Sequence, residues 1–300
     1  MIVWRFVDGR RGHENQTRGL VQALAARCPT EVHDLDAPSS RQAVAWWMIG
    51  RFPPGEGLPS PDLILGAGHA THLPMLAARR ARGGRAVVLM KPSLPVRWFD
   101  LVVAPRHDAL TGPNVIRTLG ALNPVRPGDK QAGTGLLLVG GPSRHVEWHS
   151  EAVLDQVREI VQANPGTRWR LVTSRRTPPG FAAAARALFP DGRLEVVEPH
   201  AVDADWLPAA LAAAPVVWVT ADSVSMLYES LSAGAATGLI EVPARGRSRL
   251  QQGVADLMRE GRVVSFSAWR AGVPLQPGPP LAEADRVAGE VLRRYPEACA

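Results

Sequence analysis

One stretch near the start of the chain gathers residue types that move protons. It reads Asp8-Gly9-Arg10-Arg11-Gly12-His13-Glu14-Asn15-Gln16 and joins a predicted strand to a predicted helix. A histidine at the mouth of such a helix could take a proton from an acceptor hydroxyl. We therefore interpret His13 as a candidate catalytic base that Asp8 or Glu14 orients. The residues that we expect to contact the acceptor, and call acceptor-side, are Gly12, Asn15 and Gln16. The alternative is a helix-capping loop with a solvated histidine.

Two further strand ends add polar groups to the same half of the chain. The first reads Gly66-Ala67-Gly68-His69-Ala70-Thr71-His72. Two histidines do not make a metal site without a further ligand, so we interpret Gly68 and His69 as acceptor-side lining. The second reads Met90-Lys91-Pro92-Ser93. Lys91 is one of only two lysines, which favours a phosphate or acceptor contact, with an exposed lysine as the alternative.

Three strand ends in the second half carry glycines, hydroxyls and an arginine pair. Paired arginines bind phosphate oxygens, and hydroxyls beside free helix N–H groups suit a diphosphate. Glu229, farther along its helix, could accept hydrogen bonds from two ribose hydroxyls. The alternative is that Asp222 or Ser223 caps this helix and Glu229 lies on a polar face. The candidate nucleotide-sugar contacts are Gly140, Gly141, Ser174, Arg175, Arg176, Thr177, Asp222, Ser223, Ser225, Met226 and Glu229.

Several other patterns are weaker signs of chemistry. Asp203-Ala204-Asp205 suits a helix start better than a metal site, and Ser223 has no G-x-S-x-G sequence around it. Cys28 and Cys299 lie far apart in the sequence and near no histidine cluster, so we expect neither a disulfide framework nor a zinc site. We expect no metal and no cofactor, and the cysteines favour a reducing cytoplasm.

The elements that position these residues follow the alternation typical of βαβ units. In the first half we expect strands at 2–7, 30–35, 62–66, 86–90, 101–104 and 114–117, and helices near 14–27, 39–49 and 70–82. In the second half we expect strands at 136–139, 168–173, 194–197, 216–220, 237–242 and 262–266. Its helices are expected near 148–163, 181–188, 204–213, 223–233, 247–260 and 281–294.

These elements predict an α/β fold with two Rossmann-like doubly wound domains facing a cleft. The Pro- and Gly-rich segment 123–134 is a predicted linker. We place the acceptor-side domain at 1–128 and the nucleotide-sugar domain at 129–300, with the last helix free to pack back on the first domain. Ligands in such sheets bind beyond the carboxyl ends of the strands.

The composition limits the class of protein. The 300 residues are 46% hydrophobic and 21% charged, which excludes a wholly disordered chain or a collagen. Residues 1–128 carry 16 basic and 9 acidic side chains, which gives them a net charge of +7. The whole chain has a net charge of +6, so all of its excess positive charge lies in this first half. No apolar run is long enough to span a bilayer, and no secretory signal is expected. We see no nucleic-acid-binding module.

Segment 45–54 adds a question about membranes. It holds paired tryptophans, a methionine and a phenylalanine beside Arg41 and Arg51, which suits either a membrane interface or a buried helix followed by a turn. We expect a cytoplasmic protein, and a peripheral position on the inner face of the cytoplasmic membrane stays open.

The order of these motifs resembles the mitochondrial-fission Elm-type family, whose bacterial members are also described as nucleoside-diphosphate-sugar epimerase-like. The resemblance runs from about residue 3 to about residue 265. It implies two domains of the GT-B glycosyltransferase kind, with Gly12-His13 near the acceptor, Ser223-Val224-Ser225-Met226 at the diphosphate and Glu229 at the ribose. The family's usual proline after this helix is missing from Gly234-Ala235-Ala236-Thr237.

Together, the residues and the resemblance predict a metal-independent glycosyltransferase. It would move a sugar from a nucleoside-diphosphate sugar to an anionic or lipid-linked acceptor, such as a lipopolysaccharide-type molecule. One alternative is a nucleotide-sugar epimerase of the same fold, which would need two acid–base groups such as His13 and Glu14. Another is a non-catalytic, membrane-associated adaptor.

Overall fold

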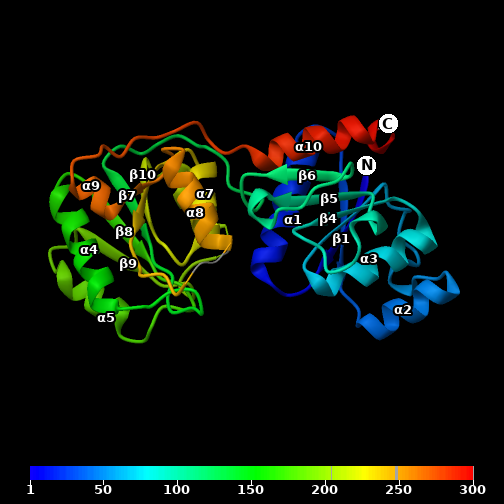
Figure 1. The fold of residues 1–300 in the computed structure, drawn as a ribbon, viewed down its shortest axis with the longest axis horizontal. Coiled ribbons are helices and arrows are strands. Elements are labelled where there is room, and N and C mark those ends of the chain that lie inside the picture. The colour runs from blue at the N-terminus through cyan, green and yellow to red at the C-terminus, as the bar shows by residue number, and fades with distance from the viewer. Residues whose placement is uncertain (204, 247–248, 300) are drawn as a thin grey trace. The chain divides into compact units, whose positions relative to one another are not determined.

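The computed structural model describes residues 1–203, 205–246 and 249–299, and the chain forms two compact α/β units. Unit 1 comprises Met1–Pro124 and the residues from Ala282 onward, and unit 2 comprises Val125–Leu281. The sequence placed the boundary at 128/129 and left the last helix of the second range free to pack back on the first domain. The structure divides the chain slightly earlier, between Pro124 and Val125, and the last helix belongs to unit 1. Figure 1 shows a sheet with flanking helices in each unit.

Unit 1 is built on a six-stranded parallel sheet in the order β2-β1-β3-β4-β5-β6. Its strands are β1 (Ile2–Val7), β2 (Glu31–Asp36), β3 (Leu63–Ala67), β4 (Arg85–Leu89), β5 (Leu101–Pro105) and β6 (Val115–Thr118). Every residue of β3 and β5 is buried. Such continuous apolar runs are typical of parallel strands covered by helices on both faces.

Two pairs of helices cover the two faces of this sheet. Helices α1 (Arg11–Ala25) and α10 (Glu283–Arg294) share one apolar cluster, in which Leu20 and Leu24 meet Val287 and Val291. Helices α2 (Ser40–Ile49) and α3 (His69–Arg82) cover the other face. The last helix therefore completes the first domain.

Unit 2 has a second six-stranded parallel sheet, in the order β12-β11-β10-β7-β8-β9. Its strands are β7 (Thr134–Leu138), β8 (Arg168–Val172), β9 (Leu194–Val197), β10 (Val216–Thr220), β11 (Ala236–Ile240) and β12 (Val264–Ser265). Its helices are α4 (Ser150–Ala163), α5 (Phe181–Leu188), α6 (Trp206–Ala213), α7 (Val224–Ser232), α8 (Arg249–Arg259) and α9 (Phe266–Arg270).

The predicted elements differ from the structure mainly at the end of unit 2. The strand expected at 262–266 is only two residues long, because the Ser265 hydroxyl accepts a hydrogen bond from the Ala268 N–H (3.2 Å) and starts α9 at Phe266. The helices expected at 204–213 and 247–260 begin at residues outside those described. The turn between α7 and β11, where the resemblance led us to expect a proline, instead contains Gly234 in the left-handed region (φ 72°).

Each sheet has one place where the strand order reverses. In unit 1 it lies between β1 and β3, and in unit 2 between β7 and β10. At such a switch point, successive helices turn to opposite faces of the sheet, and a crevice opens beyond the strand ends. None of the described helices is both long and apolar enough to cross a membrane.

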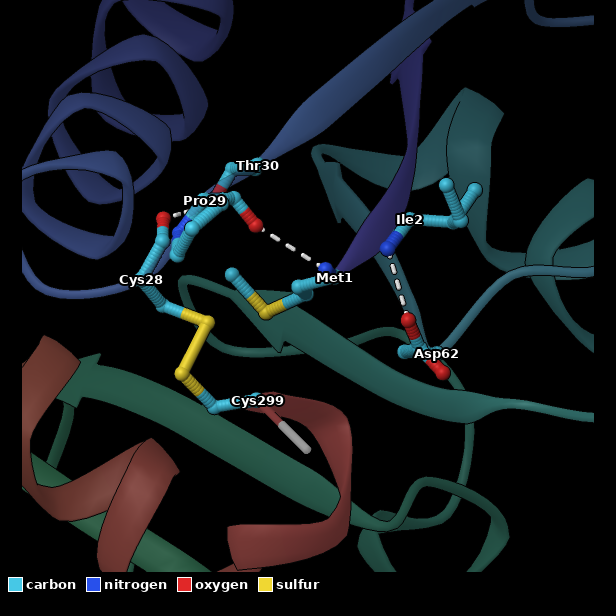
Figure 2. Close-up of a disulfide and its surroundings, with 7 residues drawn as sticks. All are labelled: Met1, Ile2, Cys28, Pro29, Thr30, Asp62 and Cys299. Carbon is cyan, nitrogen blue, oxygen red and sulfur yellow. Dashed lines mark hydrogen bonds between the residues drawn. A yellow bond between two sulfur atoms is a disulfide. The ribbon is translucent and has the colours of Figure 1, made fainter.

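A disulfide closes unit 1 and corrects the sequence analysis. Figure 2 shows Cys28, just after α1, bonded to Cys299 near the end of the chain. The two residues are 271 positions apart, and their Cα atoms are 5.8 Å apart. The expectation of unpaired cysteines was wrong because it rested on their distance in the sequence, whereas the return of the last helix to unit 1 brings them together. The argument for a reducing compartment loses this support, since disulfides persist mainly in oxidising surroundings.

Replacing Cys28 and Cys299 by serine is expected to destabilise unit 1 by about 2–5 kcal/mol, because the bond restricts the unfolded chain. Hydrogen exchange should rise first in 283–299, which the bond holds against α1. Exchange in unit 2 serves as the internal control. Unchanged protection of α10 in the double variant would show that packing alone holds this helix.

Candidate functional site

A carboxylate–imidazole pair lies at the end of β1. Asp8 Oδ2 is 2.8 Å from His13 Nδ1, and the two side chains are 5% and 18% exposed. The other Asp8 oxygen accepts a hydrogen bond from the Arg10 N–H (3.2 Å). Because an ionised carboxylate only accepts, His13 donates through Nδ1, and Nε2 remains to take a proton. Asp8, and not Glu14, makes this orienting contact.

The turn after β3 approaches this pair so closely that only glycine fits. A Cβ atom on Gly68 would lie 2.3 Å from the His13 ring and 3.2 Å from Asp8 Oδ2. Gly68 also adopts φ 86°, in the left-handed region. Two predicted strand ends, 55 residues apart in the sequence, thus meet at the switch point of unit 1.

A serine that the sequence analysis did not single out links two histidines beside this pair. Ser93 Oγ lies 2.7 Å from His69 Nδ1 and 3.0 Å from His72 Nδ1. A hydroxyl has a single proton, so one imidazole accepts from Ser93 while the other donates to it. The only signal was the position of Ser93 after β4. The backbone there turns through Met90, whose φ is 71°.

His72 is a buried, neutral member of this group. It is 2% exposed, and its ring contacts Phe99 edge-on, with centroids 5.6 Å apart. Burial, together with the smaller effects of the nearby His69 and His13, lowers the pKa of His72 to about 4. His72 therefore supports the exposed His69 through Ser93 and carries no charge near neutral pH.

The remaining acceptor-side candidates differ in exposure. Gly12 and Lys91 are exposed, and Glu14 and Asn15 are partly buried. Gln16 is 7% exposed, and its side-chain amide donates to the Gly12 carbonyl (3.3 Å), so it belongs to the helix interior. The structure thus brings together Asp8, His13 and Gly68, joins His69 to His72 through Ser93, and uses Gln16 for local structure.

The glycine loop after β7 forms the corresponding feature in unit 2. A Cβ atom on Gly140 would lie 2.1 Å from Asp222 Oδ2, and one on Gly141 would lie 2.0 Å from the Arg176 carbonyl oxygen. Ser174 and Thr177 fasten this loop from the next strand end, because their hydroxyls donate to the Gly140 carbonyl at 2.9 and 2.6 Å. The loops after β7, β8 and β10 therefore meet at the switch point of unit 2.

The Asp222 carboxylate joins all three loops. It accepts hydrogen bonds from the Gly141 N–H (3.1 Å) and the Ser223 hydroxyl (3.2 Å), and it pairs with the Arg176 guanidinium at 2.6 Å. The Asp222 side chain is fully buried, and its Oδ1 atom has no hydrogen-bond partner. Arg176 and Ser223, which the sequence assigned to a diphosphate, thus already bind an internal anion.

The other predicted residues of this site differ in exposure. Arg175 and Ser225 are exposed, and Met226 and Glu229 are partly buried along α7. Ser223 occupies the N-cap position of α7, but its side chain makes no capping hydrogen bond. The first N–H groups of a helix have no partner within it. The start of α7 therefore keeps the donors that attract an anion.

The Asp203–Asp205 pattern marks the beginning of a helix. Asp203 Oδ1 accepts from the N–H groups of Asp205 (3.0 Å) and Trp206 (2.8 Å), at the start of α6. Within the described residues, no three histidine, cysteine or acidic side chains are arranged to hold a metal ion.

The pKa of His72 predicts how acid affects stability. The unfolded chain takes up a proton on this residue near pH 6.5, whereas the folded chain does so only near pH 4. The free energy of unfolding should therefore fall by up to about 3 kcal/mol between pH 6.5 and 4. The His72→Asn variant keeps a polar atom near the Nδ1 position but has no group that titrates there. In urea unfolding, its free energy of unfolding should fall less than that of the wild type between pH 6.5 and 4. Equal losses would show that other groups cause the acid sensitivity.

Comparisons with known proteins agree with this architecture. The sequence profile of the family described as Mitochondrial fission ELM1 matches residues 11–295. A Listeria monocytogenes protein provisionally assigned as a UDP-N-acetylglucosamine 2-epimerase is 14% identical, with a TM-score of 0.63, over 99% of this chain and 97% of that chain. Acinetobacter baumannii MurG is also 14% identical, with a TM-score of 0.54, over 97% and 99% of the two chains.

A third structure shares this fold. The UDP-GlcNAc 2-epimerase of Methanocaldococcus jannaschii, in complex with UDP-GlcNAc and UDP, is 11% identical, with a TM-score of 0.52, over 99% of each chain. No match to a curated protein was found. At these identities the likeness shows the fold alone, which is that of GT-B glycosyltransferases and UDP-sugar epimerases. Because the family profile covers nearly the whole chain, the protein belongs to the Mitochondrial fission ELM1 family.

Proposed function

We propose that the protein is a glycosyltransferase that takes its sugar from a nucleoside-diphosphate donor and works without a metal ion. One observation carries the proposal: the loops after β7, β8 and β10 meet at the switch point of unit 2. This is the place where open parallel sheets bind nucleotides. The fold is shared with an epimerase that binds UDP-GlcNAc and UDP, which supports a nucleotide-sugar ligand.

In this proposal the diphosphate binds at the start of α7 and beside Arg175. The buried Asp222 holds Arg176, Ser223 and the Gly141 N–H in place, so these groups shape the loops. Contacts to the donor come from the exposed Arg175, the exposed Ser225 and the first N–H groups of α7. Glu229 accepts hydrogen bonds from the ribose hydroxyls. Fixed donors of this kind stabilise charge that develops on a leaving diphosphate.

The acid–base chemistry is assigned to unit 1. The Nε2 atom of His13 takes the proton of the acceptor hydroxyl, and Asp8 stabilises the imidazolium that forms. The acceptor oxygen then bonds to the anomeric carbon of the sugar, and the bond from that carbon to the diphosphate breaks. The basic character of residues 1–128 favours an anionic or lipid-linked acceptor.

A second candidate function, epimerisation of the nucleotide sugar, is favoured by the histidines. His13 and His69 follow the neighbouring strands β1 and β3, so unit 1 offers two acid–base groups. The sequence suggested His13 and Glu14 for these roles, and His69 is a further candidate beside them. A changed sugar formed from the donor alone, without an acceptor, would support the epimerase.

Titration calorimetry with UDP-, GDP-, CMP- and ADP-sugars tests the donor site. At least one should bind, and Arg175→Gln and Glu229→Gln should each weaken binding about tenfold or more through the loss of charge-assisted hydrogen bonds. Arg168→Gln is the matched control, because Arg168 is exposed at the amino end of the same strand, β8. The donor site is wrong if no nucleotide sugar binds, or if all three variants bind equally.

His13→Ala is expected to lower turnover about 10²–10⁴-fold and to leave the donor dissociation constant within about twofold, since the donor contacts lie in unit 2. His33→Ala is the control, because His33 lies within β2 and away from its carboxyl end. Turnover is measured as nucleotide release with and without acceptor. Full activity of His13→Ala would remove this residue from the mechanism.

A further inference from the structure

Helix α2 is apolar on the side that faces solvent. Its exposed apolar side chains are Val44, Trp47, Met48 and Ile49, which are 42%, 46%, 69% and 65% exposed. We call these four residues the α2 patch. A surface helix normally turns its apolar stripe inward and its polar residues outward. The α2 patch therefore has the composition of a covered surface.

The inner side of α2 already has its own core contacts. Ala43 is fully buried, and the Trp46 ring packs edge-on against Phe52, with centroids 5.6 Å apart. Helix α2 lies beside α3 in unit 1 (Figure 1). The two neighbouring tryptophans thus have different roles, because Trp46 packs against the core and Trp47 belongs to the α2 patch.

Arginines surround this patch. Arg41, Arg51 and Arg80 are all exposed, and the Arg80 guanidinium lies 4.8 Å above the Trp47 ring. An acidic neighbour, Glu56, lies 3.5 Å from Arg51, and both side chains are largely solvent-exposed, at 59% and 71%. Guanidinium groups bind phosphate oxygens well, and tryptophan favours the boundary between apolar and aqueous phases.

We propose that unit 1 docks on an anionic lipid bilayer through the α2 patch. Trp47, Met48 and Ile49 are consecutive, so they cover an arc of roughly 200° around the helix. Acyl chains can surround such an arc, whereas a rigid protein surface would need a deep groove. The patch is also far smaller than the roughly 20–30 residues per side of a stable protein interface. Apolar side chains would enter the interface while the three arginines meet lipid phosphates.

Co-sedimentation of the whole protein with vesicles tests this proposal. Vesicles of phosphatidylcholine with phosphatidylglycerol should bind the protein, and vesicles of phosphatidylcholine alone should bind it far more weakly. Met48→Glu and Ile49→Glu should each reduce the partition coefficient at least tenfold. Val273→Glu is the matched control, because Val273 is a comparably exposed apolar residue (44%) in unit 2, and it should leave binding unchanged.

The arginines are tested separately. Replacing Arg41, Arg51 and Arg80 by glutamine should lower binding to the anionic vesicles about fivefold per residue, and added salt should have a similar effect. The proposal is overturned if the wild-type protein does not bind anionic vesicles, or if Val273→Glu reduces vesicle binding as much as Met48→Glu does. It is also overturned if light scattering finds a dimer that Met48→Glu dissociates, because a second copy would then cover the patch.

This inference is independent of the proposed function. Met48→Glu should leave the calorimetric affinity for the donor sugar unchanged, since α2 lies in unit 1. Loss of vesicle binding and loss of donor binding are therefore separate results, each measured by its own experiment.

Discussion

Both candidate sites of this protein depend on one constraint, the parallel direction of the strands in its two sheets. Parallel strands place the loops that follow them along a single edge. The reversal of strand order then sends the helices that follow two neighbouring strands to opposite faces, while the loops before those helices stay in contact. In unit 1 these two loops carry Asp8–His13 and Gly68, and in unit 2 they carry Gly140–Gly141 and Asp222. The strand order of each sheet thus determines which of the short loop motifs come into contact.

Within both units, a buried carboxylate holds a basic side chain at the strand ends. Asp8 fixes the His13 ring, and Asp222 fixes Arg176. A carboxylate taken out of water is stable only when charges and hydrogen bonds compensate it. Each carboxylate therefore ties its partner and its loop into one rigid group. The residues that hold the loops therefore differ from those suited to contacting a ligand. Arg176 pairs with Asp222 and holds the loops, whereas the exposed Arg175 is suited to contacting a ligand.

The sequence was most informative where a short apolar run met glycine and polar residues. The strands β1, β3 and β8 were predicted within about a residue because glycine or polar residues follow each of them directly. The same property located His13 and Asp222 at strand ends. What could not be predicted depends on contacts between distant segments. Ser93 becomes part of a site only when β4 lies beside β3, and Cys28 meets Cys299 only because the last helix returns to unit 1.

The way the chain passes between its units has a consequence for biosynthesis. Unit 2 is inserted into unit 1, so a ribosome makes all of Val125–Leu281 before it makes α10. Until then the face of the first sheet that α1 shares with Val287 and Val291 stays incompletely covered. Exposed apolar surface on a nascent chain is the usual substrate of chaperones and a common cause of aggregation. The first domain to emerge is therefore the last to be completed, and the speed at which unit 2 is translated and folds sets how long the nascent chain needs protection.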